Sequence, residues 1–347
     1  MKKLISIFVI ALFIFGCGEK KEDKKVEQKD KYTFDTSDVK TTPVENPDQS
    51  FLLRYTPEKD KKYHYRITTL ASDNQTIEAD TIMTQKMKQS VVYLLDMELK
   101  NVDNDSTMEF NCNFNSIKVD ADVNGKKFNY QSGVTPDSLS KKQFSDYVAI
   151  LNSPFSVRVS KLGEILEIFR ADKIVSAYID MKGLKDSLNA TQKESVRQNL
   201  IDAGLKPLLL LVFRKVPQQT VAKDSTWAFQ QPESQFMIYK INSTAKYKVA
   251  DLEQLDGNKL ATINAGIDTK VTGNDKITER GVTYNFTKPE SKARGKIFFN
   301  ISKGLIQKSR TKTELKVHYT MEMQGPRGLQ KGSKSEVIVN TNISELL

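Results

Sequence analysis

The sequence predicts an α+β fold that is mainly β, with two antiparallel β-rich lobes and a helical segment between them. Alternating apolar and polar residues dominate both ends of the chain, helical patterns gather in the middle, and two blocks of sequence recur in the same order. Strands grouped on either side of helices favour antiparallel sheet over alternating βαβ units. We expect a first lobe over 51–170, a helical segment over 171–215 and a second lobe over 216–347.

The first lobe begins with residues that alternate as in a half-buried strand. Its predicted strands cover 63–67, 76–88, 91–102 and 107–119. Asn124-Gly125 then separates two alternating segments, which predicts a two-residue hairpin turn because both residues tolerate positive φ.

Cys112 is one of two cysteines, and it alternates with Phe110 and Phe114. This pattern predicts a buried strand residue and not a reactive thiol. With Cys17 assigned to lipid below, no intramolecular disulfide is expected.

A short helical pattern over 140–151 and a strand pair over 155–165 complete the first lobe. The central segment is then expected to hold three helices, over 171–182, 191–203 and 205–214. Thr191 and Glu194 have capping-box spacing, and Gly204 suits a helix C-terminus. The apolar run 208–213 is too short to span a membrane, so we expect a buried helix packed on a sheet. Strands return from Gln218 to the end of the chain.

Two segment pairs suggest an internal duplication. Residues 102–114 resemble 255–267, and residues 155–165 resemble 298–306. The order is the same in both halves, as a duplicated unit would require. Chance similarity between amphipathic strands is the alternative interpretation.

The first seventeen residues resemble a targeting signal. Lys2 and Lys3 precede an apolar run of about twelve residues, shorter than the ~20 that a spanning helix needs, and typical of a secretory signal. The segment 14–17, Ile-Phe-Gly-Cys, resembles the lipobox of bacterial lipoproteins, with Phe15 bulkier than is usual. The resemblance implies that Cys17 receives diacylglycerol and, after cleavage, a further acyl chain such as palmitate. An ordinary signal peptide with a chance cysteine is the alternative.

Residues 18–50 are rich in lysine and acidic residues and poor in apolar ones. Such a segment buries little surface, so we expect a disordered charged tether. Gly18 stands where an aspartate would retain an enteric lipoprotein in the inner membrane, and by this analogy we expect anchoring in the outer membrane of the cell envelope.

The mature chain resembles lipoproteins of uncharacterised function from the envelope of diderm bacteria. The shared features are the lipobox, the charged tether, the Ser-Lys-(Leu)-Gly-x-Ile strand and the late Asp-Ser-Thr-Trp segment that ends at Trp227. The resemblance implies no known activity.

The net charge of the chain indicates which kind of partner it would attract. The formal net charge is +10, and removal of Lys2 and Lys3 leaves +8. A basic envelope protein suits anionic lipid or lipopolysaccharide phosphates. No nucleic-acid partner is expected, because an exported chain leaves that compartment and no recognition motif is present.

Candidate catalytic and metal-binding residues are few. His64 and His318 each lie on the polar phase of a strand, so we expect both side chains to point outward. Around His318, the apolar phase of the strand consists of Leu315, Val317, Tyr319 and Met321. Asp120 and Asp122, followed by Asn124 and Gly125, match the first half of a calcium loop, but a hairpin explains the same residues. We predict no catalytic, cofactor-binding or metal site.

The function expected from the sequence is a binding module for a lipid or other apolar ligand, held at the membrane by Cys17. The alternative is a scaffold lipoprotein that holds an envelope protein through exposed strand edges. An enzyme ranks last, because no catalytic constellation supports one.

Overall fold

The computed structural model describes residues 31–134, 142–325 and 328–347. The lipobox, Cys17 and the first part of the expected tether lie outside the described residues. The strands are β1 (Thr42–Pro43), β2 (Lys62–Glu78), β3 (Ile82–Val102), β4 (Met108–Val123), β5 (Lys126–Gln131), β6 (Phe155–Val159), β7 (Ile165–Phe169), β8 (Thr226–Gln230), β9 (Ser234–Phe236), β10 (Tyr239–Leu255), β11 (Asn258–Thr272), β12 (Lys276–Glu279), β13 (Val282–Asn300), β14 (Leu305–Gly325) and β15 (Gly328–Leu346). The helices are α2 (Ser145–Ile150), α3 (Asp172–Met181), α4 (Ala190–Asn199), the π-helix η1 (Leu200–Leu205) and α5 (Lys206–Val212).

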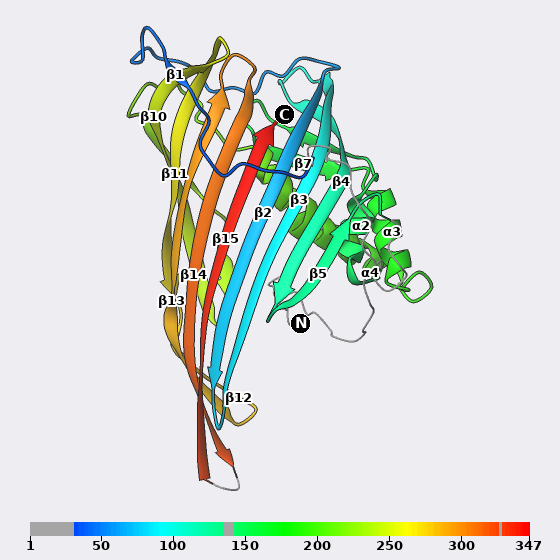
Figure 1. Cartoon of the computed structure of the whole chain (residues 1–347), viewed down its shortest axis with the longest axis vertical. Coiled ribbons are helices and arrows are strands. Elements are labelled where there is room, and N and C mark those ends of the chain that lie inside the picture. The colour runs from blue at the N-terminus through cyan, green and yellow to red at the C-terminus, as the bar shows by residue number, and fades with distance from the viewer. Residues whose placement is uncertain (1–30, 135–141, 326–327) are drawn as a thin grey trace.

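The described strands form a single 15-stranded antiparallel sheet (Figure 1), whose main path runs β1-β10-β11-β13-β14-β15-β2-β3-β4-β6-β7. The mainly β prediction is therefore confirmed. The division into two lobes is not, because β15 pairs along its length with β2 and makes the two halves neighbours in one sheet. This pairing joins opposite ends of the chain, which local alternation cannot indicate.

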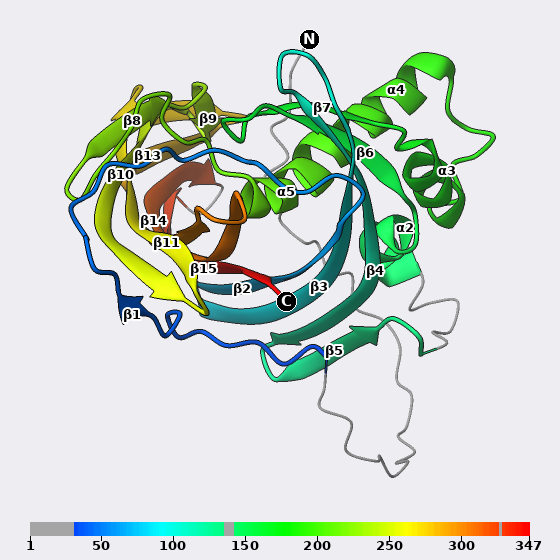
Figure 2. The same cartoon turned by 90° about the horizontal axis from the view of Figure 1, so that it is seen from above.

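The sheet is strongly curved and holds α5 on its concave side (Figure 2). We call the concave side the inner face and the convex side the outer face. The helices lie beside the upper half of the sheet in Figure 1, whereas the long strands continue below them to a narrow end. We call the end with α5 proximal, and the end with the β2–β3 turn at 79–81 distal.

The proximal core forms where α5 meets the inner face. Leu208, Leu209, Leu211 and Val212 of α5 are buried, as the apolar run predicted. Because residues directly opposite in antiparallel strands share a face, register pairs then identify the inner residues. One such row joins Ser309, Ser344, Ile67, Tyr93 and Ile117, and all five are buried.

Two strand predictions can be compared directly with the structure. Asn124 and Gly125 have φ of 53° and 86°, so the predicted hairpin turn between β4 and β5 is confirmed. The strand predicted over 76–88 is wrong in one respect, because residues 79–81 form the turn between β2 and β3. That turn lacks the glycine, proline or asparagine that usually announces one.

The helical segment contains the predicted helices with two corrections. The capping box at the start of α4 uses Asn189 and Gln192, whose side chains each bond the other's backbone N–H at 2.9 Å. The predicted pair, Thr191 and Glu194, lies further inside the helix. Gly204 does not end a helix but lies within η1, which continues into α5.

Residues 31–43 correct the expected tether at its C-terminal part, because they lie across the outer face (Figure 1). We call them the N-terminal strap. Tyr32 is buried, and Asp38 pairs with Lys296 at 2.6 Å. The strap ends in β1, which pairs with β10. Lys296 and Lys308, which bind its aspartates, are more than 250 residues away in the sequence, so the segment's composition alone did not reveal the contact.

The similar segments of the two halves occupy similar places in the sheet. The run β10-β11-β13-β14 has the same order as β3-β4-β6-β7, and in each run a hairpin turn joins the first two strands and another joins the last two. The turns that follow β6 and β13 also hold the same piece of chain, because Tyr55 N–H donates to Lys161 O and Thr56 N–H donates to Gly304 O. This arrangement is consistent with the proposed duplication.

Candidate functional site

The side chains of the inner face become more exposed beyond the end of α5. At α5, the hydroxyls of Ser309 and Ser344 donate to the Leu211 carbonyl at 3.3 and 2.6 Å. These bonds satisfy a carbonyl at the helix C-terminus that has no partner within the helix. Further along β14 toward the distal end, the inner side chains are half-buried or exposed, with the exception of Val317. The distal half of the inner face is therefore the more accessible surface.

An apolar stripe follows the inner side of β14. It consists of the alternate residues Leu315, Val317, Tyr319, Met321 and Met323. The sequence pattern predicted four of these as the apolar phase of a strand, and Met323 extends the series to 41% exposure. Soluble proteins rarely leave a continuous apolar strip open without a binding role.

Aromatic rings widen the apolar stripe at its distal end. Tyr319 contacts Phe286 and Tyr284 on β13, with ring centroids 5.1 and 6.0 Å apart. Tyr239 on β10 extends the cluster to Phe286 at 6.4 Å, and its hydroxyl donates to Asp275 at 2.8 Å. Burial, followed by that bond to Asp275, raises the pKa of Tyr239 to about 12, so the phenol remains neutral.

A polar strip lies beside the apolar stripe on the inner side of β15 and β2. Lys334 and Glu336 form an ion pair at 2.9 Å. Asp73 is adjacent, and burial, followed by the charge of Glu336, raises its pKa to about 6. The inner face is thus amphipathic, with an apolar side and a polar side next to each other.

Aromatic residues and one arginine mark the proximal end of this face. Trp227 on β8 stacks on Tyr247 of β10 with a centroid distance of 5.4 Å. Arg214, two residues after α5, interacts electrostatically with Tyr247 and Tyr55. Trp227 packs against the main core.

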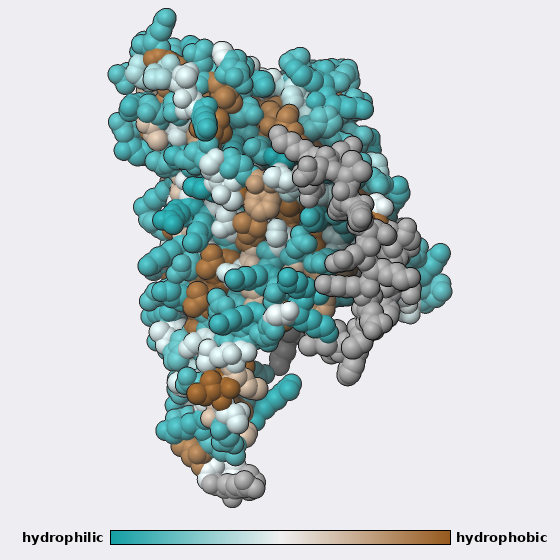
Figure 3. All heavy atoms as spheres, viewed as in Figure 1, coloured by the Kyte–Doolittle hydropathy of each residue, from teal (hydrophilic) through white to brown (hydrophobic). Residues whose placement is uncertain are grey.

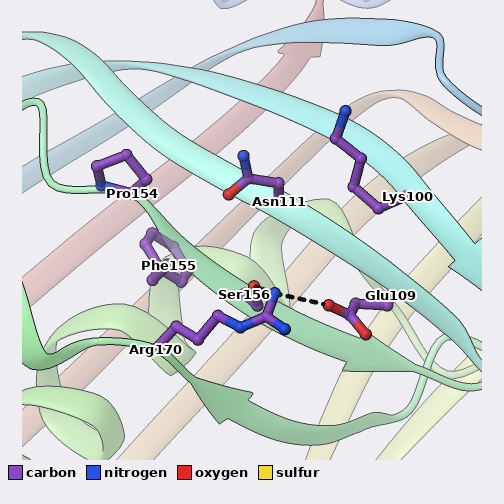
Figure 4. Close-up of a pocket in the computed structure, with 7 residues that line it drawn as sticks. All are labelled: Lys100, Glu109, Asn111, Pro154, Phe155, Ser156 and Arg170. Atoms are coloured by element: carbon purple, nitrogen blue, oxygen red, sulfur yellow. Dashed lines mark hydrogen bonds and ion pairs between the residues drawn. The ribbon is translucent and has the colours of Figure 1, made fainter.

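A small hollow of about 250 Å³ lies near the β4–β6 edge of the sheet (Figure 4). Its charged groups are already paired, since Arg170 binds Glu109 at 3.0 Å and Lys100 binds Glu98 at 2.6 Å. The remaining lining residues are Asn111, Pro154, Phe155 and Ser156. With its charges satisfied locally, this hollow is a weaker candidate than the inner face.

The histidines lie where the sequence predicted them. His64 and His318 are exposed on the outer side of their strands, bonded to Asp96 at 2.6 Å and to Ser335 at 2.9 Å. Within the described residues, no three His, Cys, Asp or Glu side chains are grouped as a metal site would need.

The cysteine and the calcium-like loop also have structural roles. Cys112 is completely buried, and burial raises its pKa well above the ordinary value. Asp122 accepts a bond from Gly125 N–H at 2.8 Å and so supports the hairpin turn. Asp120 lies 3.9 Å from Lys118 on the same strand. Cys17, the one predicted site residue, lies outside the described residues.

The outer face differs from the inner one. Figure 3 shows it as mostly hydrophilic, with apolar side chains in scattered patches. Two exposed apolar residues of this face, Ile82 and Leu329, belong to strand ends at the distal tip. None of the described helices is long and apolar enough to cross a bilayer.

Sequence reasoning did not single out Arg214 or the ring cluster. A cation directly after six consecutive apolar residues was the available signal for Arg214, because such a residue is drawn into the core that the run forms. The cluster of Tyr239, Tyr284, Phe286 and Tyr319 depends on pairing between β10, β13 and β14, which no local pattern specifies.

The fold and the face define a β-sheet protein with a helix-filled core and an open amphipathic concave surface. A family model, a family of unknown function (DUF6263), matches residues 105–306, more than half of the chain. The chain belongs to this family. The expected membership of a family of unknown function is confirmed, while lipidation and envelope location remain predictions.

Comparisons with solved structures give low similarity. A structure of lipovitellin, which concerns lipid–protein interactions, aligns with a TM-score of 0.39 and 10% identity over 84% of this chain and 25% of that one. The chain therefore spans about a quarter of lipovitellin's length. Pseudomonas aeruginosa OccK2 in complex with glucuronate aligns with a TM-score of 0.19 and 6% identity, over 83% of this chain and 100% of that one. An outer membrane channel from Pseudomonas putida F1 gives 0.19 and 7%, over 85% and 98%. No curated protein matches the chain significantly.

Proposed function

We propose that this protein binds an amphiphile with an apolar chain on the distal half of its inner face. The observation that carries the proposal is the apolar stripe on β14, which remains half-buried or exposed apart from Val317, while α5 fills the proximal half. A ligand chain lying on this stripe would complete the burial that α5 provides elsewhere. The adjacent polar strip suits a ligand with polar groups along one side.

Burial of an apolar chain on the stripe would supply enough free energy for binding. Each methylene removed from water stabilises a complex by about 0.8 kcal/mol, so ten buried methylenes supply about 8 kcal/mol. That equals the free energy of a micromolar complex, before the cost of association is subtracted. Methionine adds tolerance, because its flexible thioether adapts to chains of different shape.

A matched pair of substitutions on β14 tests the proposal. Met321→Gln places an amide in the stripe, and Thr320→Gln places the same amide on the opposite side of the same strand. We expect Met321→Gln to weaken binding of the neutral dye N-phenyl-1-naphthylamine about tenfold, the effect of ~1.4 kcal/mol. Thr320→Gln should leave it unchanged. Equal effects of the two substitutions would contradict the proposed surface.

The proposed setting is the cell envelope, with the protein anchored in the outer membrane through lipidated Cys17. The support is the short apolar segment that ends at this cysteine. Cys17→Ala should move the protein from the membrane to the soluble fraction, and the intact mass of the unaltered protein should exceed that of the cleaved chain by the mass of the lipid. A bare mass on membrane-bound protein would contradict lipidation.

A second candidate function is the scaffold expected from the sequence. Strand β7 ends the sheet's main path, and Leu166 on it is 53% exposed. An envelope protein could add a strand at this edge. In-cell crosslinking from position 166 should then recover one consistent protein, whereas a random set of products would reject the scaffold.

A further inference from the structure

Arg214 is a half-buried cation without an acidic partner among the described residues. Its Nε is buried and makes no hydrogen bond. The titratable groups that neighbour its guanidinium are the phenols of Tyr247 and Tyr55, not a carboxylate. Burying a guanidinium without its counter-charge is unfavourable, and in agreement burial lowers the pKa of Arg214.

Other half-buried arginines have partners. Arg54 also has no carboxylate partner in the described part of the chain, but it donates to the backbone carbonyls of Leu53, Pro217 and Gln218. Arg66 pairs with Glu345, and Arg158 with Asp103. Lys215, next to Arg214, pairs with Glu164 at 3.3 Å. The unpaired state of Arg214 is therefore not a general feature of this basic protein.

A second unsatisfied donor belongs to the same group of aromatic residues. Trp227 Nε1 is buried and has no hydrogen-bond partner among the described residues. Trp227 stacks on Tyr247, which is also one of the two phenols that interact with Arg214. Two buried donors beside one tyrosine fit an acceptor that comes from outside the chain.

Strand register places this group at the start of the open inner face. Tyr247 lies opposite Ala265 on β11, and Ala265 lies opposite Gly295 on β13. Gly295 in turn lies opposite Thr311 on β14, so Tyr247 and Thr311 share a face. Thr311 is two residues distal to Ser309, the residue that bonds α5. From Thr311 the inner side of β14 continues to Tyr319 of the apolar stripe, a length of about 26 Å at 3.3 Å per residue.

We propose, on the basis of the proposed function, that Arg214 binds the anionic head group of the amphiphile, with the Trp227 indole N–H as a second donor. The head group is a carboxylate or a phosphate, both of which accept bonds from a guanidinium. The ligand's apolar chain then lies along the stripe toward Tyr319.

Trp227 provides a local probe, because it is the only tryptophan of the chain. The chain from residue 18, which retains every described residue, is titrated with dodecanoate, dodecyl phosphate, neutral dodecanol and cationic dodecyltrimethylammonium, each as monomer. Tryptophan fluorescence reports binding at the head-group site, and competition with N-phenyl-1-naphthylamine reports binding on the stripe. Inorganic phosphate alone is a further arm, which separates a lipid head group from a free anion.

We expect the two anionic amphiphiles to bind at least tenfold more tightly than dodecanol, because hydrogen bonds to charged groups are stronger than those between neutral groups. The tighter of the two identifies the head group as carboxylate or phosphate. Arg214→Gln should remove the anionic preference and leave dodecanol binding unchanged. Arg214→Lys should retain part of it, and Lys215→Gln, which removes a paired cation, should retain all of it.

Three results would overturn the head-group site. They are equal affinity for the anionic and neutral amphiphiles, an unchanged preference in Arg214→Gln, and binding of inorganic phosphate as tight as that of dodecyl phosphate. In the first two of these the stripe still binds a chain, so the proposed function stands, whereas in the third the chain adds no affinity and the site binds a free anion. Failure of all four amphiphiles to displace the dye rejects both. Because the first comparison uses the unaltered protein, the test does not depend on the folding of a variant.

Discussion

Gly163 and Gly304 lie in the equivalent turns that follow β6 and β13, and both press against residues 55–56. Each has positive φ, 80° and 59°. A Cβ at Gly304 would lie 2.8 Å from Thr56 Cα and closer still to the Thr56 nitrogen and hydroxyl. Glycine is thus required here both by conformation and by space.

Alanine at Gly304 should therefore destabilise the fold by about 2–4 kcal/mol, combining positive-φ strain with overpacking. Gly183→Ala is the matched control, because Gly183 has φ of 69° with nothing within 4 Å of a Cβ. Its cost should be only about 1 kcal/mol. Urea unfolding measures both, and equal losses would show that the contact with Thr56 is unimportant.

Asp73 gives a prediction about pH. Its pKa is raised from 3.8 to about 6, so the folded chain binds this proton more tightly than the unfolded chain does. Asp73 therefore stabilises the fold fully below pH 3.8, and this stabilisation is lost as the pH rises through about 6. Asp73→Asn should gain stability relative to the parent at pH 7.5, and the gain should shrink or reverse at pH 4. A stability difference independent of pH, measured by urea unfolding, would contradict this account.

At the scale of elements, the N-terminal strap crosses a row of outer-face residues. Lys118 at one end of this row lies 5.8 Å over the Tyr32 ring, and Arg310 at the other end donates to the Thr36 carbonyl. Val92, Thr68 and Ile343 lie opposite one another on β3, β2 and β15, and all are at most 3% exposed. Exposed outer residues elsewhere, such as His64 and His318, show that the outer face is buried only in places.

Tyr32→Ala should loosen the strap, because Tyr32 is 3% exposed and its hydroxyl bonds Ser132 at 3.0 Å. We expect a loss of about 2 kcal/mol, below the range for a buried aromatic, since a strap can detach locally. Hydrogen exchange should become faster at Val92, Thr68 and Ile343. Lys40→Ala, an exposed position on the strap, is the control. Unchanged exchange in Tyr32→Ala would mean that the strap is not held through this residue.

The elements themselves were largely predictable from the sequence. Alternation located the strands around Cys112 and the stripe from Leu315 to Met321, and helical periodicity located α3 to α5. The errors arose where local signals were absent or duplicated. The 79–81 turn contains Asp80 but no glycine, proline or asparagine, and Asn189 competes with Thr191 as the first capping residue of α4.

At the scale of the whole molecule, pairing between distant segments decides what the sequence left open. The β15–β2 pair, with Leu346 opposite Tyr65, converts two expected lobes into one sheet. Pairing of β8 with β10 places Trp227 beside Tyr247, and the segment after α5 brings Arg214 to the same end of the inner face. Such contacts have large sequence separation, so the site could be anticipated as an apolar phase of β14 but not as a surface with a charged end.

The central claim is that the inner face holds an apolar chain, and native mass spectrometry tests it most directly. The chain from residue 18, purified from cells without detergent, should carry a bound species of lipid mass that is released on unfolding. Met321→Gln should carry less of it than Thr320→Gln. A bare protein mass in repeated preparations of the unaltered chain would contradict the claim.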